Sequence, residues 1–290
     1  MPQLSVLIPV KDGMPYLKST VSSTLRAMPR DAELLVLDDG STDGTGTFLA
    51  SVRDKRLRVF RNEQPAGVAA ASTALLSHAS GEHVARIDGD DICLPWRFTV
   101  QRRALEGVDM VFSQALMINA KNVPYRPHLE PGISPEAMPL HLLMTNVLMN
   151  PTMYAARSAL ESLGGYQPTP AEDYDLWLRA AAAGLRMLRI PWLPTIAYRR
   201  HQTQLSQRRA WSDENGDRIL ADSFGKLAAD RIGFHGSAST ILYNRPAPGK
   251  PYPEDPDVAD FARCMMEAAS RLGKRDRHGV EARLRASYRL

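Results

Sequence analysis

Three carboxylates surround one glycine in the stretch Asp88-Gly89-Asp90-Asp91. It directly follows residues 84–87, a short run that is typical of a buried strand. Like charges held together at the end of a core strand repel each other and lose hydration, and a divalent cation would offset both effects. Mg²⁺ and Mn²⁺ take oxygen ligands, usually one or two carboxylates plus substrate phosphates. The pattern indicates a cation site, with a solvated acidic turn before Pro95 as the alternative.

Other acidic residues also follow predicted strands. Asp12 stands just after an apolar strand at 4–10, and Asp38-Asp39 follow a second strand at 33–37. Ligands of parallel sheets gather beyond the carboxyl ends of the strands. We therefore expect these carboxylates to converge in space with Asp88 and Asp90.

A further acidic pair, Glu172-Asp173, opens a predicted helix at 172–183. The helix dipole favours anions at that end. A carboxylate with an unperturbed pKa of ~3.9 is ionised at neutral pH and can accept a proton from a substrate within hydrogen-bond reach. A simple N-cap is the alternative role for Asp173.

The elements that position these residues alternate between strands and helices. Strands are predicted at 4–10, 33–37, 57–60 and 83–87, with helices at 16–28, after Gly44 and at 67–80. Such alternation predicts a parallel sheet covered on both faces.

The second half of the chain is less regular. Residues 121–135 contain four prolines and are predicted to be a loop or lid. Strands are predicted at 110–113, 150–155, 186–190 and 195–198, and helices from Pro95 to about 105, at 157–163, at 172–183 and at 212–232. A Pro-rich linker is predicted at 245–256, before a helical, basic remainder.

Composition excludes several classes of protein. The chain has 290 residues, a net charge of +4 and a pI of about 9.1, and it lacks the aromatic-interleaved basic stripe of a nucleic-acid-binding protein. Cys93 and Cys264 are expected to be reduced thiols. No signal-peptide pattern and no run of ~20 apolar residues is found. We therefore expect a cytoplasmic protein.

The chain resembles the family-2 glycosyltransferases, which have the GT-A fold. The matching pieces occur in the family's order across about residues 4–205. They are Ser5-Val6-Leu7-Ile8-Pro9-Val10, Leu37-Asp38-Asp39-Gly40-Ser41-Thr42-Asp43-Gly44-Thr45, Ala79-Ser80-Gly81-Glu82, the acidic stretch with Pro95, Glu172-Asp173 and Tyr198-Arg199-Arg200-His201. The resemblance implies an α/β fold with a Rossmann-like, mainly parallel sheet flanked by helices, followed by a helical C-terminal extension.

The resemblance also implies an activity. A sugar would pass from a nucleotide-diphospho-sugar donor, with UDP favoured, to a hydroxyl of a saccharide or lipid-linked acceptor, with inversion at the anomeric carbon. Mn²⁺ or Mg²⁺ would be the cofactor. Bacterial polysaccharide or glycolipid assembly is the setting suggested by analogy.

Roles carry over by position. Asp90 would ligate the metal, with Asp88 and His201 as further candidate ligands, and Asp173 would be the general base, with Glu172 beside it. The remaining predicted donor-binding residues are Pro9, Asp12, Asp38, Asp39, Gly67, Asp91 and Arg199, with Asp88 also placed near the ribose.

Departures from the family leave the nucleotide open. Ser72 and Thr73 stand where relatives commonly have Arg and Asn, Leu75 replaces a small residue, and Asp12 replaces Asn. Donors carrying dTDP or GDP therefore stay possible alternatives to UDP.

Two other functions are weighed. A dehydrogenase or methyltransferase would place a G-x-G-x-x-G loop after the first strand, and residues 9–13 lack it. A non-catalytic sugar-nucleotide scaffold would have no need of Asp90 and Asp173.

The predicted organisation is a glycosyltransferase domain at 1–205, with a nucleotide-sugar half at 1–115 and an acceptor half at 116–205, followed by the extension at 206–290. The tail carries an apolar stripe among many arginines. It would lie on an anionic membrane or, as we favour, dock on the catalytic domain or on a second subunit of a homo-oligomer. The members of the stripe are Phe261, Met265, Ala269, Leu272, Val280, Leu284 and Tyr288.

Overall fold

A computed structural model describes residues 2–128, 130–202, 204, 218–243 and 255–288. The described residues group into two compact units. The first lies within Met1–Gly132, Leu148–Pro168 and Leu188–Gln204, and the second within Ile133–Val147, Thr169–Met187 and Leu205–Leu290. The predicted functional ranges 1–205 and 206–290 remain predictions, because the two units are defined by packing and not by function.

The first unit is built on a sheet of nine strands among the residues described. Their order is β3-β2-β1-β4-β8-β6-β9-β5, with β7 paired to β6. The parallel part consists of β1 (Leu4–Val10), β2 (Ala32–Asp39), β3 (Leu57–Asn62) and β4 (His83–Arg86). All residues of β1 and β2 are buried, as expected for central parallel strands.

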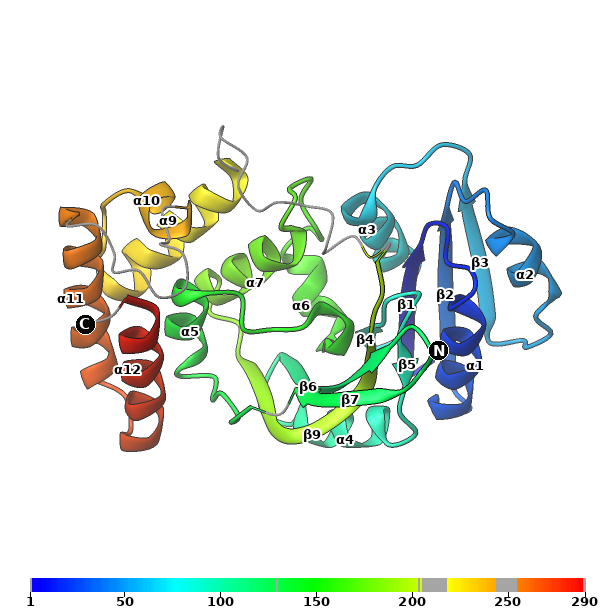
Figure 1. Ribbon diagram of the computed structural model, residues 1–290, viewed down its shortest axis with the longest axis horizontal. Helices are drawn as coiled ribbons and strands as arrows, with labels where there is room; N and C mark the ends of the chain where they lie inside the picture. The colour runs from blue at the N-terminus through cyan, green and yellow to red at the C-terminus, as the bar shows by residue number, and fades with distance from the viewer. Residues whose placement is uncertain (1, 129, 203, 205–217, 244–254, 289–290) are drawn as a thin grey trace. The chain divides into compact units, whose positions relative to one another are not determined.

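Helices connect and cover these strands (Figure 1). The helices of this part are α1 (Leu17–Ala27), α2 (Thr45–Ser51) and α3 (Val68–His78). The carboxyl ends of the parallel strands therefore lie along one edge of the sheet, as the sequence predicts.

The rest of the sheet is antiparallel. It contains β8 (Tyr154–Ala156), β6 (Met110–Asn119), β9 (Met187–Arg200) and β5 (Ile92–Cys93), while β7 (Pro124–His128) pairs with β6. The helices α4 (Arg97–Ala104) and α6 (Arg157–Ser162) and the 3₁₀ helix η1 (Asn150–Thr152) complete this unit.

Three sequence expectations are corrected here. The loop or lid expected at 121–135 contains the strand β7, which tolerates Pro124 and Pro127 because it pairs on one side only, with β6. The strands expected at 186–190 and 195–198 form one strand, β9, which continues through Pro191 and Pro194. The strand expected at 150–155 is divided between η1 and β8.

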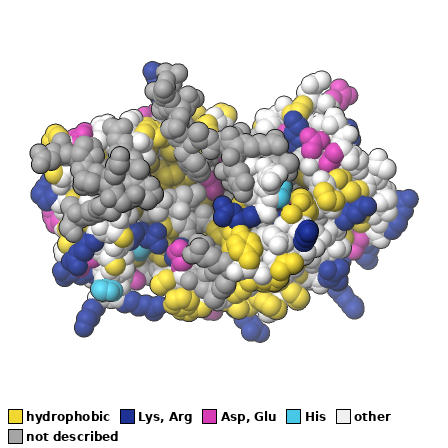
Figure 2. All heavy atoms as spheres, viewed as in Figure 1, with side chains coloured by type: hydrophobic (Ala, Val, Ile, Leu, Met, Phe, Trp, Pro, Cys, Tyr) yellow, Lys and Arg dark blue, Asp and Glu magenta, His cyan; other side chains and the backbone are white. Residues whose placement is uncertain are grey.

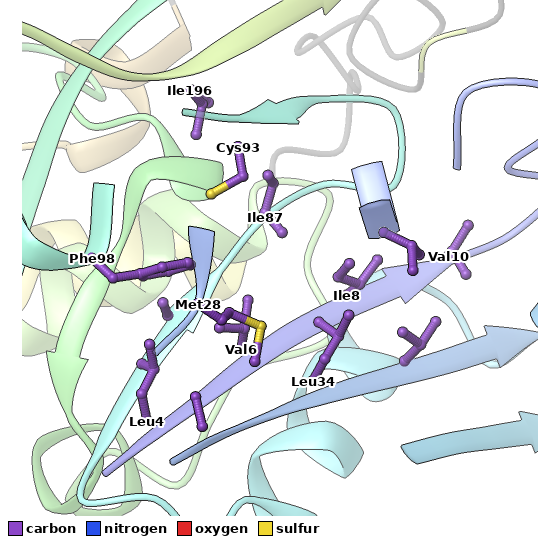
Figure 3. Close-up of a cluster of buried hydrophobic side chains, with 14 of the residues drawn as sticks. Leu4, Val6, Ile8, Val10, Met28, Leu34, Ile87, Cys93, Phe98 and Ile196 are labelled. Atoms are coloured by element: carbon purple, nitrogen blue, oxygen red, sulfur yellow. The ribbon is translucent and has the colours of Figure 1, made fainter. Parts of the chain in front are cut away.

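The core of the first unit lies between this sheet and its helices (Figure 3). Alternate residues of β1 face it, namely Leu4, Val6, Ile8 and Val10. Ile87, which directly precedes the acidic stretch, is fully buried in the same cluster. The apolar core therefore holds the strand end from which that stretch emerges.

The second unit is helical. It contains α5 (Met138–Met144), α7 (Glu172–Ala182), α9 (Arg218–Ile232), α10 (Ala238–Tyr243), α11 (Pro256–Ser270) and α12 (Lys274–Tyr288). Aromatic rings pack at its centre, where Phe261 contacts Phe224, Phe234 and Tyr288. The predicted helix at 212–232 is described from 218 onward, and most of the expected linker at 245–256 falls outside the described residues.

The apolar stripe of the tail is packed inside this second unit. Phe261, Met265, Val280 and Leu284 are all fully buried. The stripe therefore packs against the chain's own helices, among them α5 of the range predicted to be the glycosyltransferase domain, while contact with a second subunit or a membrane stays a prediction. Among the helices described, none combines the length and the apolar character needed to cross a membrane.

Candidate active site

The loops after β1 and β2 are joined by hydrogen bonds. The backbone N–H of Asp12 donates to Ser41 Oγ at 2.9 Å, and Thr42 N–H donates back to Asp12 Oδ1 at 2.9 Å. Asp12 takes a left-handed backbone conformation, with φ of +50°. The predicted donor-binding residue Asp12 thus lies at the strand edge, and one oxygen of its carboxylate is engaged by the neighbouring loop.

The predicted donor-binding residues Asp39 and Gly67 are in direct contact. The Asp39 carboxylate is buried and accepts hydrogen bonds from Asn62 Nδ2, Ala66 N–H and Gly67 N–H, each at 2.8 Å. These contacts hold the start of α3 against the end of β2. Gly67 itself is exposed and has φ of +90°, a conformation that favours glycine.

Asp38 is also buried, and its two oxygens have separate partners. Oδ1 accepts from Ser41 N–H at 2.9 Å, and Oδ2 pairs with Arg61 Nη1 at 3.0 Å. Pro9, which lies beside Leu37 in the register of β1 and β2, is buried in the sheet. The structure therefore places these predicted residues at one edge, with Asp38 anchoring the loop after β2.

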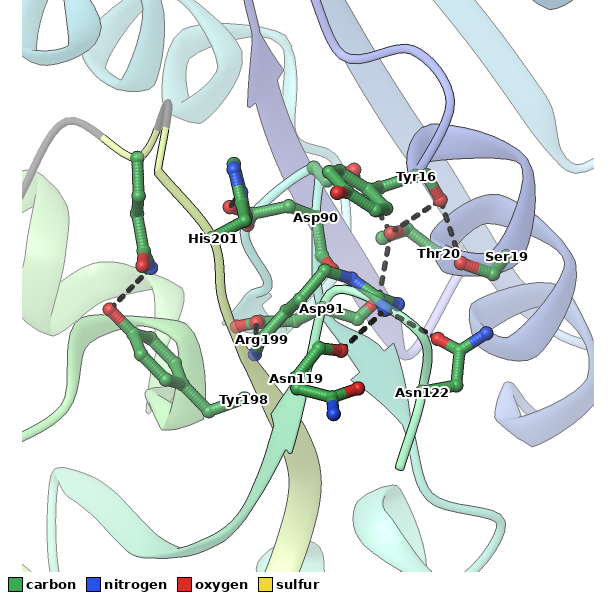
Figure 4. Close-up of polar contacts among 12 residues, drawn as sticks. Tyr16, Ser19, Thr20, Asp90, Asp91, Asn119, Asn122, Tyr198, Arg199 and His201 are labelled. Atoms are coloured by element: carbon green, nitrogen blue, oxygen red, sulfur yellow. Dashed lines mark hydrogen bonds and ion pairs between the residues drawn. The ribbon is translucent and has the colours of Figure 1, made fainter. Parts of the chain in front are cut away.

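The acidic stretch forms a tight turn beyond β4 (Figure 4). Thr20 Oγ1 donates to the carbonyl oxygens of Gly89 and Asp91, at 3.0 and 2.7 Å. A Cβ at Gly89 would come within 2.9 Å of Val10 Cγ2, so a larger residue would force the turn away from β1. The turn is therefore fixed from the side of α1 and β1.

The three carboxylates of the turn have different partners. Asp90 Oδ2 lies 2.8 Å from His201 Nε2. Asp88 Oδ1 lies 3.3 Å from Arg86 Nε and the side chain of Asp88 is one-third exposed, whereas Asp91 is fully buried and accepts a hydrogen bond from Arg199 N–H at 2.8 Å. The predicted ligand Asp90 and the distant candidate His201 are thus brought into contact.

Burial, followed by the charges of neighbouring carboxylates, shapes the electrostatics of this turn. Burial raises the pKa of Asp90, and the charge of Asp88 adds to that effect while His201 opposes it. Burial also raises the pKa of Asp91 well above its ordinary value, together with the charges of Asp90 and Asp88. Burial and neighbouring carboxylates therefore both disfavour the charged forms of Asp90 and Asp91. An added cation would favour the ionised carboxylates.

Arg199 ties the turn to the β6–β7 connection. Its buried guanidinium donates from Nε to the Asp90 carbonyl oxygen at 2.6 Å, and from Nη1 to the carbonyl oxygen of Asn119 and the side chain of Asn122. It also lies over the ring of Tyr16, 4.6 Å from the centroid. Arg199 therefore supports the turn, and its predicted contact with a diphosphate stays a prediction.

Some residues around the turn were missed by sequence reasoning. Tyr16 packs against both Arg199 and His201, with its ring centroid 4.7 Å from that of His201 (Figure 4). Thr20 and Asn122 hold the backbone and the arginine. The only sequence signal for Tyr16 and Thr20 is their position soon after the end of β1.

The side chains of Asp90, His201 and Asp88 would suit a cation that binds together with a phosphate-bearing ligand. Across the described ranges, no cluster of three or more carboxylate, imidazole or thiol side chains forms a complete metal cage. Asp90 and His201 nevertheless offer an oxygen and a nitrogen ligand at one point, with the partly exposed Asp88 nearby. Mg²⁺-type sites commonly take one or two protein carboxylates and complete their shell with phosphate and water.

The predicted general base stands in the second unit. Asp173 is the second residue of α7 and is partly exposed. Its Oδ1 accepts from Tyr174 N–H at 2.7 Å and its Oδ2 from Asn146 Nδ2 at 3.2 Å. The N-cap position belongs to Ala171. Asp173 thus accepts an N–H of the first helical turn, its role as general base stays a prediction, and Glu172 is likewise partly exposed.

A third acid of α7 is structural. Asp175 is fully buried, pairs with Arg179 Nε at 2.8 Å and accepts from Ser223 Oγ at 2.6 Å. These contacts join α7 to α9 within the second unit. Of the acids in the first turn of α7, Glu172 and Asp173 therefore remain as candidates for chemistry.

The sequence model of glycosyl transferase family 2 matches residues 5–164. Among curated relatives, Bacillus subtilis EpsE, named as a glycosyltransferase, is 31% identical over 201 residues, covering 64% of this chain and 69% of that protein. Escherichia coli WfgD is 24% identical over 177 residues, covering 60% and 68%. Its name describes a UDP-Glc:α-D-GlcNAc-diphosphoundecaprenol β-1,3-glucosyltransferase.

Solved structures share the fold at lower identity. Staphylococcus aureus TarS, residues 1–349 in complex with UDP-GlcNAc, has a TM-score of 0.62 at 17% identity, covering 100% of this chain and 90% of that one. The mannosyltransferase PcManGT from Pyrobaculum calidifontis, in complex with GDP-Man and Mn²⁺, has a TM-score of 0.56 at 19% identity, covering 99% and 86%. Both likenesses confirm the predicted α/β architecture.

Proposed function

The chain belongs to glycosyl transferase family 2, and from this premise we propose that it transfers a sugar from UDP to an acceptor hydroxyl with inversion at the anomeric carbon. The observation that carries the proposal is the contact between Asp90 and His201, at 2.8 Å, at the carboxyl edge of the parallel sheet. This is the edge at which α/β proteins bind nucleotides.

A divalent cation is part of the proposal. Asp90 and His201 would hold Mn²⁺ or Mg²⁺, with Asp88 as a further ligand or as a partner of bound water. When bound, the cation supplies positive charge where the leaving diphosphate develops negative charge. The complex of PcManGT with GDP-Man and Mn²⁺ supports this choice.

The donor is proposed to carry UDP. WfgD is named for a UDP-sugar and TarS was solved with one, whereas PcManGT was solved with GDP-Man. Asp39 and Gly67 are proposed to border the site of the nucleobase. The Gly67 N–H donates to the Asp39 carboxylate, which holds the two residues together at the end of β2. Ser72, where relatives commonly carry a cation, accepts a hydrogen bond from Arg86 Nη1 at 2.6 Å, so a guanidinium from β4 occupies this region.

Asp173 is proposed to accept the proton of the attacking hydroxyl. Its carboxylate accepts hydrogen bonds from Asn146 Nδ2 and from the Tyr174 N–H, and these contacts orient it. An ionised carboxylate within reach of a hydroxyl is suited to general-base catalysis. Glu172, the preceding residue, is the second candidate.

The acceptor is proposed to be lipid-linked, in the assembly of a bacterial polysaccharide or glycolipid. The support is the name of WfgD, which specifies a diphosphoundecaprenol acceptor. A saccharide without a lipid is the alternative acceptor.

A donor panel tests the function. We expect purified protein with Mn²⁺ to hydrolyse one UDP-sugar slowly and to transfer it faster when a diphospholipid-linked sugar is added, and chelation by EDTA to stop both reactions. Turnover of a GDP- or dTDP-sugar in place of every UDP-sugar would overturn the choice of nucleotide. If no nucleotide sugar reacted while a nicotinamide cofactor or methyl donor raised the melting temperature, the transferase function itself would be wrong.

A further inference from the structure

Two exposed tryptophans belong to the first unit, on elements that a hydrogen bond joins. Trp192 is 57% exposed, Trp96 is 44% exposed, and Leu193 next to Trp192 is 38% exposed. The indole Nε1 of Trp96 donates to the Pro194 carbonyl oxygen at 2.8 Å, so the start of α4 lies against the middle of β9. We call Trp96, Trp192 and Leu193 the aromatic patch.

The backbone at Trp192 is strained. Its φ of +57° lies in the left-handed region, which bulky L-residues rarely adopt. Core packing does not account for this conformation, because the side chain is the most exposed of the large hydrophobic residues. By contrast, Trp177 in the second unit is fully buried. Backbone strain clusters at active sites, ligand clamps and switch regions, so this outlier motivates the search for a contact at this surface.

The elements that carry the aromatic patch have only positive charges. The helix α4 and the strand β9 contain no acidic residue, although Arg97, Arg189 and Arg199 are buried. Arg189 pairs with Glu130, whose carbonyl oxygen accepts from the Trp192 N–H. Arg102 and Arg103 are exposed. Arg103 stands seven positions after Trp96, which places the two on one face of α4.

Hydrophobic side chains also gather over β7 and β9 at the lower edge of the view in Figure 2. Two further exposed apolar residues, Val123 and Tyr125, belong to the β6–β7 hairpin at 53% and 52% exposure. Isolated exposed apolar residues need no explanation, but a group of aromatic residues with basic neighbours does.

We propose that the aromatic patch docks on the surface of an anionic lipid bilayer. Tryptophan rings favour the boundary between headgroups and acyl chains, and arginines near an anionic surface are attracted to it. The inference rests on the proposed function in one respect, since a lipid-linked acceptor would be presented at a bilayer. The docking surface differs from the C-terminal stripe, whose apolar residues Val280 and Leu284 are buried.

The test uses the full-length chain and sedimentation with vesicles. One set contains phosphatidylcholine and phosphatidylglycerol, and the other contains phosphatidylcholine alone. The patch variant is Trp192→Ser/Leu193→Ser, and the charge variant is Arg102→Glu/Arg103→Glu. Val59→Ser is the matched control, because Val59 is 43% exposed on β3, an edge strand that does not carry the patch. Melting temperatures of all variants check that they are folded.

We expect the wild type and Val59→Ser to bind the phosphatidylglycerol vesicles. Binding should weaken about tenfold or more in the patch variant. It should also weaken in the charge variant and at high salt. Equal binding by the patch variant and the wild type, or no binding by the wild type, would overturn the proposal. If the patch variant instead dissociated a dimer and vesicles bound neither protein, the patch would be an interface between copies of this chain.

The vesicles contain neither acceptor nor nucleotide sugar, so this result does not depend on glycosyl transfer. A protein that binds vesicles but transfers no sugar would contradict only the proposed function. A protein that transfers sugar to a water-soluble acceptor but ignores vesicles would contradict only the docking surface.

Discussion

Asp90 Oδ2 and His201 Nε2 lie 2.8 Å apart, although 111 positions separate the two residues in the chain. The contact joins the turn after β4 to the segment that follows β9. It pairs a carboxylate whose pKa is raised by burial with an imidazole that can accept or donate a proton or bind a metal. This pair is the centre of the proposed donor site.

We expect Asp90→Asn to lose the dependence of UDP binding on Mn²⁺. The amide keeps the shape of the side chain but removes its charge, so the cation loses its proposed direct ligand. Titration calorimetry with UDP, with and without Mn²⁺, measures this. Asp54→Asn is the control, because Asp54 pairs with Arg56 before β3, away from the turn. Unchanged Mn²⁺-dependent binding in Asp90→Asn would show that the cation binds elsewhere.

Asp173→Asn should reduce kcat by ~10² or more while the affinity for the donor stays unchanged. The substitution preserves size but removes the proton acceptor. The rate of sugar transfer at saturating acceptor is the measurement, and Glu172→Gln is the companion variant. A larger loss in Glu172→Gln than in Asp173→Asn would assign the base to Glu172.

Replacement of Glu33 by Gln should make the free energy of unfolding less dependent on pH in the acidic range. Burial raises the pKa of Glu33, but hydrogen bonds from Ser5, from the side chain and backbone of Ser80 and from Arg58 outweigh burial, so the net pKa lies below the usual 4.5. A carboxyl whose pKa is lowered by folding stabilises the protein above its unfolded pKa. That stabilisation is lost as the pH falls through the folded pKa.

Urea unfolding of the wild type and Glu33→Gln from pH 7 to pH 3 measures this effect. At pH 7 the variant should be less stable by about 1–3 kcal/mol, because buried donors such as Ser5 Oγ lose a charged acceptor. The difference should shrink as the pH falls below the usual pKa of 4.5. A difference that stayed constant with pH would contradict the assigned cause.

Arg199→Lys should destabilise the first unit by about 2 kcal/mol or more, although it preserves the charge. An ammonium group cannot reproduce the divergent contacts of the guanidinium with the Asp90 carbonyl oxygen and the side chain of Asn122. Chemical denaturation measures the loss. Arg200→Lys is the matched control, since Arg200 is exposed. Equal stability of the two variants would show that these contacts contribute little.

The sequence predicts much of the parallel half of this fold because its signals are local. The strands β1 and β2 are mainly apolar. Asp12 follows β1, Asp38-Asp39 end β2, and the two loops meet at one edge as expected. The prolines Pro124 and Pro127 favour a loop, and the sequence does not show that β7 pairs with β6 on one side only. Single-strand propensity does not show which strands lie at an edge.

The carboxylates of the candidate site can be predicted from the sequence, whereas the residues that hold them in place cannot. Asp88, Asp90 and His201 stand in recognisable motifs, and the structure brings Asp90 and His201 into contact. Tyr16 and Asn122 belong to no motif, and they act through the guanidinium of Arg199. Such contacts between distant segments depend on tertiary packing, which leaves no periodic pattern in the sequence.

The contacts of the turn at Asp88–Asp91 bear on the order in which parts of the protein can fold. Thr20 bonds to the Asp91 carbonyl oxygen across 71 positions, and Arg199 bonds to that of Asp90 across 109. Contacts between residues so far apart in the sequence form slowly, because closing the long intervening loop costs entropy. During synthesis, the parallel strands can pair once β4 has left the ribosome, but the acidic turn gains its final supports only after His201 has emerged. A nascent chain that stops before β9 could therefore pair its parallel strands but would lack the contacts of Arg199 and His201 with the turn.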